Sequence, residues 1–201
     1  MRERKAGVIP MKFLDNLFRQ GNYEPSDNWH EDFIVHVAEL LKPQVYVELG
    51  IYRASLFNKM AKVAGECYGV DHNPDSARWI TPSPNSHFYR MTTNEFSYEL
   101  KHLPGIDMLF IDAGHDAESV VNDFCNYSTY VRQDGIIFIH DTYPRSREYT
   151  GAEYCGNGYK AIERLKQLRG FEMMTIPKHP GLTICRKSNH QVMWDEVMWD
   201  D

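Results

Sequence analysis

IDMLFID, residues 106–112, is an almost continuous apolar run that ends in an acid. GIIFIHD, residues 135–141, has the same character and ends in His140 and Asp141. Runs of this kind are typical of strands buried on both faces of a parallel sheet. In an open α/β sheet, ligands bind outside the carboxyl ends of the strands. The two runs therefore predict neighbouring central strands with a functional site where they end.

Further strand patterns alternate with helix patterns along the chain. Strands are expected at residues 44–49, 66–71 and 86–91, helices at 32–41, 54–64, 116–131 and 159–168, and closing strands at 171–176 and 182–186. Because strands and helices alternate, the sequence predicts an α/β fold with a doubly wound, mostly parallel sheet. Pro177, Pro180 and Gly181 turn the chain between the closing strands, so an antiparallel C-terminal strand is expected.

Composition excludes several classes of protein. The chain has 201 residues, enough for one α/β domain, and its 42% hydrophobic and 25% charged residues argue against a disordered chain. A net charge of -6 gives no general attraction to nucleic acid or anionic lipid. No stretch has about 18 uninterrupted apolar residues, and the N-terminus lacks the apolar core of a secretory signal. We therefore expect a cytoplasmic protein with no nucleic-acid or membrane partner.

Four cysteines lie far apart in the sequence, at positions 67, 125, 155 and 185. They lack the C-x-x-C spacing of a zinc site or a redox pair. We interpret them as small buried hydrophobic residues.

Polar residues follow the expected strands at the edge where ligands should bind. In chain order they are Glu48, Gly50, Asp71, Thr92, Thr93, Asp112, His115, His140 and Asp141. Each single acid could merely mark the point where a strand reaches water. Acids after four of five strands favour a binding site instead.

The loop after the first strand, residues 50–55 (GIYRAS), resembles a nucleotide-binding turn that keeps only its leading glycine. In a dinucleotide site a second glycine lets the backbone approach the pyrophosphate, and Tyr52 stands there instead. This substitution disfavours a nicotinamide dehydrogenase and favours a ligand without a pyrophosphate. Asp71 comes 21 residues after Gly50, where a carboxylate can accept hydrogen bonds from both hydroxyls of a ribose.

VELGIYRAS (47–55) and YGVDHNP (68–74) resemble motifs I and II of the class I S-adenosylmethionine-dependent methyltransferases. More narrowly, residues 106–124 and 134–142 resemble a subfamily that includes macrolide-sugar O-methyltransferases and cephalosporin-pathway methyltransferases. The resemblance implies a Rossmann-like domain over residues 29–187, after a segment of residues 1–28 and before an acidic, aromatic tail of residues 188–201. The tail could dock on its own domain or on a second subunit, so a homo-oligomer is one expectation.

S-adenosylmethionine fits the first loop because it offers a ribose and an amino-acid tail but no phosphate. The residues expected to bind it are Glu48, Gly50, Tyr52, Ser55, Asp71, Thr92 and Asp112.

The resemblance also implies roles for the acids at the central strand ends. Asp112 and Asp141 would hold a divalent metal such as Mg²⁺, and His115 would be the general base, so these three form the expected catalytic set. His140 stands where some metal-binding relatives carry a second acid, and it would either join the ligands or orient them from behind. The alternative for His115 is a histidine that caps the helix beginning near Asp116.

These inferences converge on methyl transfer to a small-molecule hydroxyl, on a sugar or a natural product. An N-methyltransferase is less favoured because residues 140–144, HDTYP, lack the Asn/Asp-Pro-Pro-aromatic signature. A non-catalytic module that binds S-adenosylmethionine and regulates a partner is the remaining alternative. Intact Asp112, His115 and Asp141 argue against it.

Overall fold

The computed structural model describes residues 28–188. Most of the N-terminal segment and of the C-terminal tail, with Trp194 and Trp199, lies outside the described residues. The boundaries drawn for those segments and the docking of the tail therefore stay predictions.

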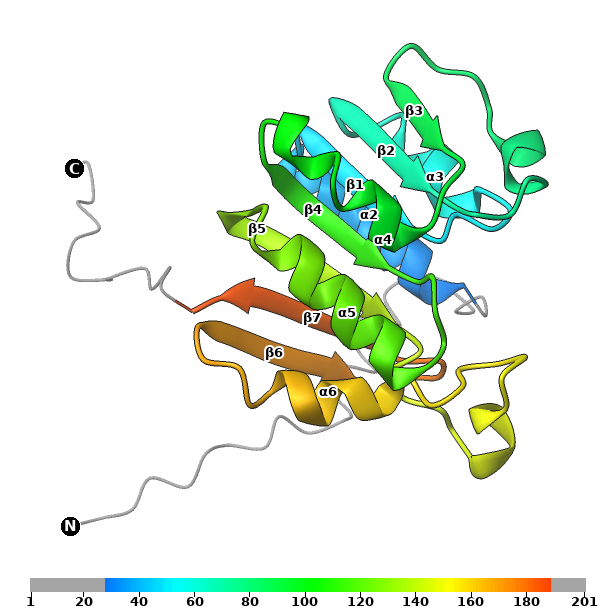
Figure 1. The fold of residues 1–201 in the computed structure, drawn as a ribbon, viewed down its shortest axis with the longest axis vertical. Coiled ribbons are helices and arrows are strands. Elements are labelled where there is room, and N and C mark those ends of the chain that lie inside the picture. The colour runs from blue at the N-terminus through cyan, green and yellow to red at the C-terminus, as the bar shows by residue number, and fades with distance from the viewer. Residues whose placement is uncertain (1–27, 189–201) are drawn as a thin grey trace, which may run out of the picture.

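A seven-stranded sheet forms the centre of the molecule (Figure 1), in the order β3-β2-β1-β4-β5-β7-β6. The strands are β1 (Val45–Leu49), β2 (Glu66–Val70), β3 (Ser86–Tyr89), β4 (Ile106–Ile111), β5 (Val131–His140), β6 (Phe171–Ile176) and β7 (Leu182–Lys187). The first five strands pair in parallel, and β7 pairs antiparallel with both β5 and β6. The predicted α/β class, the mostly parallel sheet and the antiparallel C-terminal strand are confirmed.

Helices cover both faces of this sheet. They are α2 (Trp29–Leu41), α3 (Ser55–Met60), α4 (Thr93–Phe96), α5 (Ala117–Ser128) and α6 (Tyr159–Leu165), with short 3-10 turns at Ser76–Trp79, Leu100–His102 and Arg147–Thr150. In Figure 1, α4, α5 and α6 lie in front of the sheet, and α2 and α3 lie behind it. Alternate residues of β1 enter different cores: Val47 packs with residues of α5 and α6, and Tyr46 packs with residues of α2 and α3. The sheet is therefore doubly wound.

Several element boundaries differ from the sequence prediction. The helix expected at residues 54–64 ends at Met60, and the one expected at 116–131 covers Ala117–Ser128. Strand β5 begins at Val131 rather than at residue 135, and its register against β4 shifts between Ile106 and Met108. Tertiary pairing set these ends, which local periodicity does not encode.

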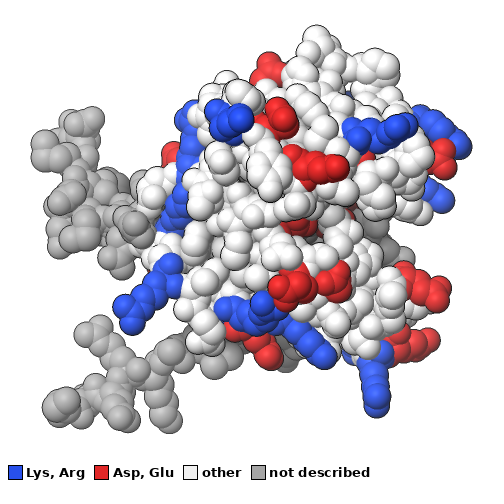
Figure 2. Space-filling view, in the orientation of Figure 1, with Lys and Arg blue, Asp and Glu red and all other residues white. Residues whose placement is uncertain are grey.

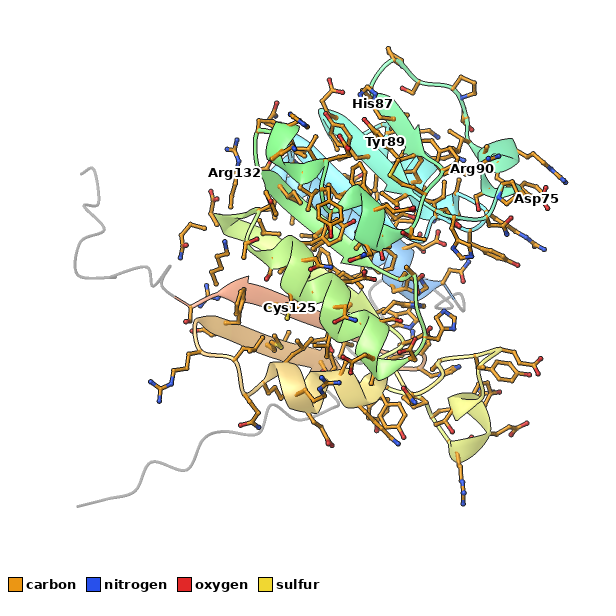
Figure 3. All side chains as sticks on the ribbon, viewed as in Figure 1. Asp75, His87, Tyr89, Arg90, Cys125 and Arg132 are labelled. Atoms are coloured by element: carbon orange, nitrogen blue, oxygen red, sulfur yellow. The ribbon has the colours of Figure 1, made fainter. Side chains whose placement is uncertain are left out.

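Within residues 28–188, no helix is long and apolar enough to cross a membrane. On the face shown in Figure 2, Lys and Arg are interspersed with Asp and Glu and do not gather into one patch. Cys67, Cys155 and Cys185 are buried as expected, but Cys125 is exposed on α5 (Figure 3).

Candidate active site

A cavity of about 870 Å³ lies at the carboxyl ends of β1, β2, β4 and β5. Eight of the residues expected from the sequence line it: Gly50, Tyr52, Asp71, Thr92, Asp112, His115, His140 and Asp141. The topology explains this convergence, because parallel neighbouring strands deliver their carboxyl ends to one edge of the sheet.

Gly50 allows the ends of β1 and β4 to approach closely. Its φ is 83°, and a Cβ built on it would lie 2.2 Å from the backbone oxygen of Asp112. Its N–H donates to Val70 O at 2.8 Å. Only glycine fits this position, because any side chain would collide with backbone that cannot give way.

Tyr52 keeps the shape of a glycine turn without the glycine. Its φ is 45°, and Ala54 nearby has a φ of 54°, so both lie in the left-handed region that L-residues seldom adopt. The ring of Tyr52 is 67% exposed. The backbone of the turn is therefore retained, although a bulky residue stands at the position of the second glycine.

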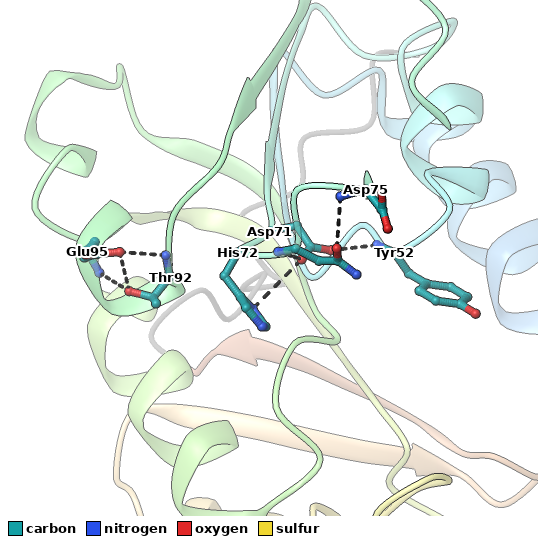
Figure 4. A network of polar contacts seen from close by, with 7 residues as sticks. Tyr52, Asp71, His72, Asp75, Thr92 and Glu95 are labelled. Atoms are coloured by element: carbon teal, nitrogen blue, oxygen red, sulfur yellow. Dashed lines mark hydrogen bonds and ion pairs between the residues drawn. The ribbon is translucent and has the colours of Figure 1, made fainter. Parts of the chain in front are cut away.

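The carboxylate of Asp71 is fixed by the backbone on both sides (Figure 4). One oxygen accepts from Tyr52 N at 2.9 Å and the other from Asn73 N at 2.9 Å. A carboxylate offers about four lone-pair sites, so both oxygens can still accept from a ligand. Thr92, also at the cavity, caps α4 in a reciprocal capping box with Glu95.

The structure does not bring Glu48 and Ser55 into this cavity. Glu48 is 2% exposed and accepts a 2.6 Å hydrogen bond from the hydroxyl of Tyr46. Burial raises the pKa of Glu48 well above its ordinary value, so this carboxyl is held as the neutral acid. Ser55 donates to Glu31 at 2.7 Å.

Asp112, His115 and Asp141 converge at the other end of the cavity. Each offers one ligand atom, and these three atoms lie within 4.8 Å of one another. His115 Nε2 is 3.5 Å from Asp141 Oδ2. The expected ligand set joined His140 to the two acids, but the structure places His115 with them instead. Their separation fits a single divalent ion after small side-chain movements.

His140 lies behind the acids rather than beside them. Its Nδ1 is 3.0 Å from Asp112 Oδ1 and 3.6 Å from Asp141 Oδ1. Burial lowers the pKa of His140. The charges of Asp112 and Asp141 and the hydrogen bond to Asp112 raise it by a larger amount, so the net pKa is about 9. At neutral pH its imidazolium therefore compensates the two carboxylates. Its Nε2 is buried without a partner among the described residues.

His115 is not the cap of helix α5. The cap is Asp116, whose side chain accepts from the backbone N–H groups of Glu118 at 3.1 Å and Ser119 at 2.9 Å. The backbone oxygen of His115 instead accepts from the N–H groups of Asn157 and Gly158, both at 2.9 Å. Residues 142–158 thus hold the His115 backbone in place and leave its ring, 38% exposed, facing the cavity.

Sequence reasoning missed Asp123, which lines the cavity from α5 and is 4% exposed. Burial raises the pKa of Asp123 to about 6, partly offset by a hydrogen bond with Thr93. A signal was present, because Asp123 shares the apolar face of the helix with Val120 and Tyr127. An acid on such a face is either paired or shifted in pKa.

Comparisons with known proteins support this description of the fold. Residues 47–142, somewhat less than half of the chain, match the profile of a family described as a methyltransferase domain. No curated protein matches the chain in a sequence comparison.

Solved structures share the fold at low sequence identity. A candidate O-methyltransferase from Klebsiella pneumoniae has a TM-score of 0.68 and 15% identity over 87% of this chain and 89% of its own. The O-methyltransferase from Bacillus cereus in complex with S-adenosylhomocysteine has a TM-score of 0.67 and 10% identity over 87% and 86%. An rRNA methylase from Streptococcus thermophilus has a TM-score of 0.57 and 12% identity over 79% and 93%.

Residues 47–142 are thus similar to a methyltransferase domain, and the chain shares the fold of solved methyltransferases. The structural neighbours include both O-methyltransferases and an rRNA methylase, so the fold alone does not select the acceptor. The acceptor must be argued from the residues of the site.

Proposed function

We propose that this protein transfers a methyl group from S-adenosylmethionine to a hydroxyl of a small molecule, assisted by a divalent metal ion. The observation that carries the proposal is the convergence of Asp112, His115 and Asp141 within 4.8 Å at one end of the cavity. Asp71 lies at the other end, at the carboxyl end of β2. One cavity thus offers a place for a ribose and a place to activate a hydroxyl.

The cofactor half of the cavity fits S-adenosylmethionine. Asp71 is held with free lone pairs toward the cavity, where ribose hydroxyls would donate. Gly50, which lets the ends of β1 and β4 approach closely, lines the cavity at the place proposed for the methionine tail. S-adenosylmethionine supplies a methyl group already activated on a sulfonium, so this protein mainly has to align acceptor oxygen, carbon and sulfur.

The catalytic half fits a divalent cation held by Asp112 and Asp141. Carboxylate oxygens are the donors that Mg²⁺ prefers. A bound cation lowers the pKa of a hydroxyl that it contacts. His115 Nε2 would receive the proton, because the nitrogen of a neutral imidazole can accept it. His140 orients Asp112 through the 3.0 Å contact of its Nδ1. If His115 were instead the third ligand, its Nε2 could not also accept the proton.

The rival functions have less support. An N-methyltransferase is less favoured because residues 140–144 lack the Asn/Asp-Pro-Pro-aromatic signature. A module that has lost catalysis is disfavoured because Asp112, His115 and Asp141 are all present at the cavity.

Calorimetry tests the cofactor. S-adenosylhomocysteine is expected to bind and NAD is expected not to, because Tyr52 crowds the place of a pyrophosphate. Equal or tighter binding of NAD would overturn the cofactor class.

A metal titration tests the catalytic half. Activity, measured with an acceptor found by screening hydroxylated sugars and phenols, should rise with added Mg²⁺ in the wild type. Asp141→Ala should abolish this response because one of the two carboxylate ligands is lost. Asp134→Ala is the control, since Asp134 is an exposed acid on the same strand. Full wild-type activity in excess chelator would remove the metal from the mechanism.

A further inference from the structure

A second cavity, of about 660 Å³, adjoins the catalytic half of the first. It lies between the loop that follows β5 and the start of α6, and Thr142, Tyr143, Ser146, Arg147, Thr150 and Lys160 are among its lining residues. We propose that this cavity binds an anionic group, a phosphate or a carboxylate, carried by the acceptor substrate. The inference rests on the proposed function, since it names the class of molecule that is methylated.

The two cavities differ in the charge of the residues that line them. Arg147 and Lys160 line it, and no acid does. Within residues 28–188, neither cation forms an ion pair, although Lys160 Nζ lies 5.9 Å from the ring centroid of Tyr159. The first cavity is lined by acids, including Asp71, Asp123 and Glu153. An acceptor with an anionic group would therefore be attracted by the second cavity and repelled by the first.

Hydroxyl groups line the same cavity and supply hydrogen-bond donors beside those of the two cations. Thr142 is 7% exposed, and its Oγ1 is buried without a hydrogen-bond partner among the described residues. Leaving a buried hydroxyl unpaired costs about 1 to 3 kcal/mol, so binding of a group that pairs with this hydroxyl would be favourable. Phosphate and carboxylate oxygens are acceptors only, which suits a site of cations and hydroxyls.

The position of the cavity connects it to the chemistry. Asp141 lines the first cavity, and Thr142, the next residue, lines the second. The same loop supplies Glu153 to the first cavity and Arg147 to the second. The volume exceeds that of an isolated phosphate and lies in the range of pockets for small molecules, roughly 300 to 1,000 Å³. One acceptor could thus place its hydroxyl at the acid cluster and its anionic group near Arg147 and Lys160.

Direct binding of small anions tests this proposal without the unknown acceptor. The probes are inorganic pyrophosphate and malonate, titrated by calorimetry at constant ionic strength with chelator and saturating S-adenosylhomocysteine. The first cavity is then filled and metal-free, so a bound anion reports on the second. Binding of pyrophosphate alone assigns a phosphate, and binding of malonate alone assigns a carboxylate.

Paired substitutions identify the site. Arg147→Gln combined with Lys160→Gln should weaken anion binding about tenfold or more for each charge-assisted hydrogen bond that is lost. Lys166→Gln combined with Arg169→Gln removes the same charge from exposed positions outside the cavity, and should leave the affinity within about twofold. Thr142→Val should also weaken binding while both cations remain. Equal losses in the two double variants, or no binding of either probe to the wild type, would overturn the proposal.

The same titrations separate this inference from the proposed function. If S-adenosylhomocysteine binds and neither anion does, the anionic acceptor is refuted and the methyltransferase proposal stands. If the anions bind through Arg147 and Lys160 but S-adenosylhomocysteine does not bind, the methyltransferase proposal fails and the claim about its acceptor fails with it.

Discussion

The two ends of the main cavity hold their carboxylates by different means. Asp71 is fixed by backbone N–H groups of Tyr52 and Asn73, each at 2.9 Å. Asp112 and Asp141 are positioned by histidine side chains, with His140 Nδ1 at 3.0 Å from the first and His115 Nε2 at 3.5 Å from the second. Two carboxylates that lie close together attract a divalent cation, so the catalytic end should respond to metal ions and the binding end should not.

The largest effect is expected at the catalytic end. His115→Ala should reduce turnover by roughly 10² to 10⁴, the usual span for a general base, while metal affinity is kept. Only a neutral imidazole can accept the proton of the acceptor, so the loss should fall on turnover. Steady-state rates and a metal titration of the wild type and the variant measure both properties.

A histidine at the edge of the sheet serves as the control. His87→Ala removes an imidazole on β3 that pairs with Glu66 at 2.7 Å, away from the cavity, and should leave turnover and metal affinity unchanged. A His115→Ala variant that loses metal binding together with activity would make His115 a ligand rather than the base. Full activity of that variant would remove His115 from the mechanism.

A smaller effect is expected at the binding end. Asp71→Asn should weaken S-adenosylhomocysteine binding about 10-fold to 100-fold, because one charge-assisted hydrogen bond to the ribose is lost. Asparagine is preferable to alanine here, since its amide oxygen can still accept from one backbone N–H and retain part of the loop anchor. Calorimetry of the wild type and the variant would measure the two affinities.

The matched control is Asp75→Asn, which alters an exposed acid a few residues further along the same loop. Asp75 pairs with Arg78 and does not line the cavity. If Asp71→Asn binds as tightly as the wild type, the ribose does not lie on Asp71 and the cofactor must be placed elsewhere.

Much of the binding end could be predicted from the sequence. Gly50 and Asp71 follow short apolar strands directly, so their order along the chain gives their place on the sheet edge. Glu48 and Ser55 were expected beside them, but neither lines the cavity. Strand alternation and helix direction decide where such side chains point, and a motif position does not record this.

The catalytic end was harder to predict in detail. Asp112, His115 and Asp141 were expected together, but whether His115 or His140 joins the acids depends on side-chain directions at the ends of β4 and β5. The second cavity depends on how the loop of residues 142–158 folds against His115. Such loops have no periodicity from which a conformation can be predicted.

Asp123 belongs to neither end and gives the smallest expected effect. It lies on α5, and burial raises its pKa to about 6, from an unfolded value near 3.9. Between these two values the folded protein binds more protons than the unfolded chain, so stability should fall as pH rises from about 4 to about 6 and then level off. Asp123→Asn should remove this cost and stabilise the ligand-free protein by about 2 kcal/mol at pH 7.5, since one pKa unit corresponds to about 1.4 kcal/mol.

Urea unfolding at pH 4 and pH 7.5 distinguishes a stability gain that comes from removing the buried charge from a gain that does not depend on pH. The gain from Asp123→Asn should be small at pH 4, where Asp123 is already neutral in the folded protein, and full at pH 7.5. Glu163→Gln, which neutralises an exposed acid on α6, should change stability by less than about 0.5 kcal/mol at both values. An equal gain at both pH values would mean that the amide packs better than the acid, and a loss at pH 7.5 would mean that the charged carboxylate is stabilised by a partner. The second result would extend to Asp123 the charge compensation that His140 provides for Asp112 and Asp141.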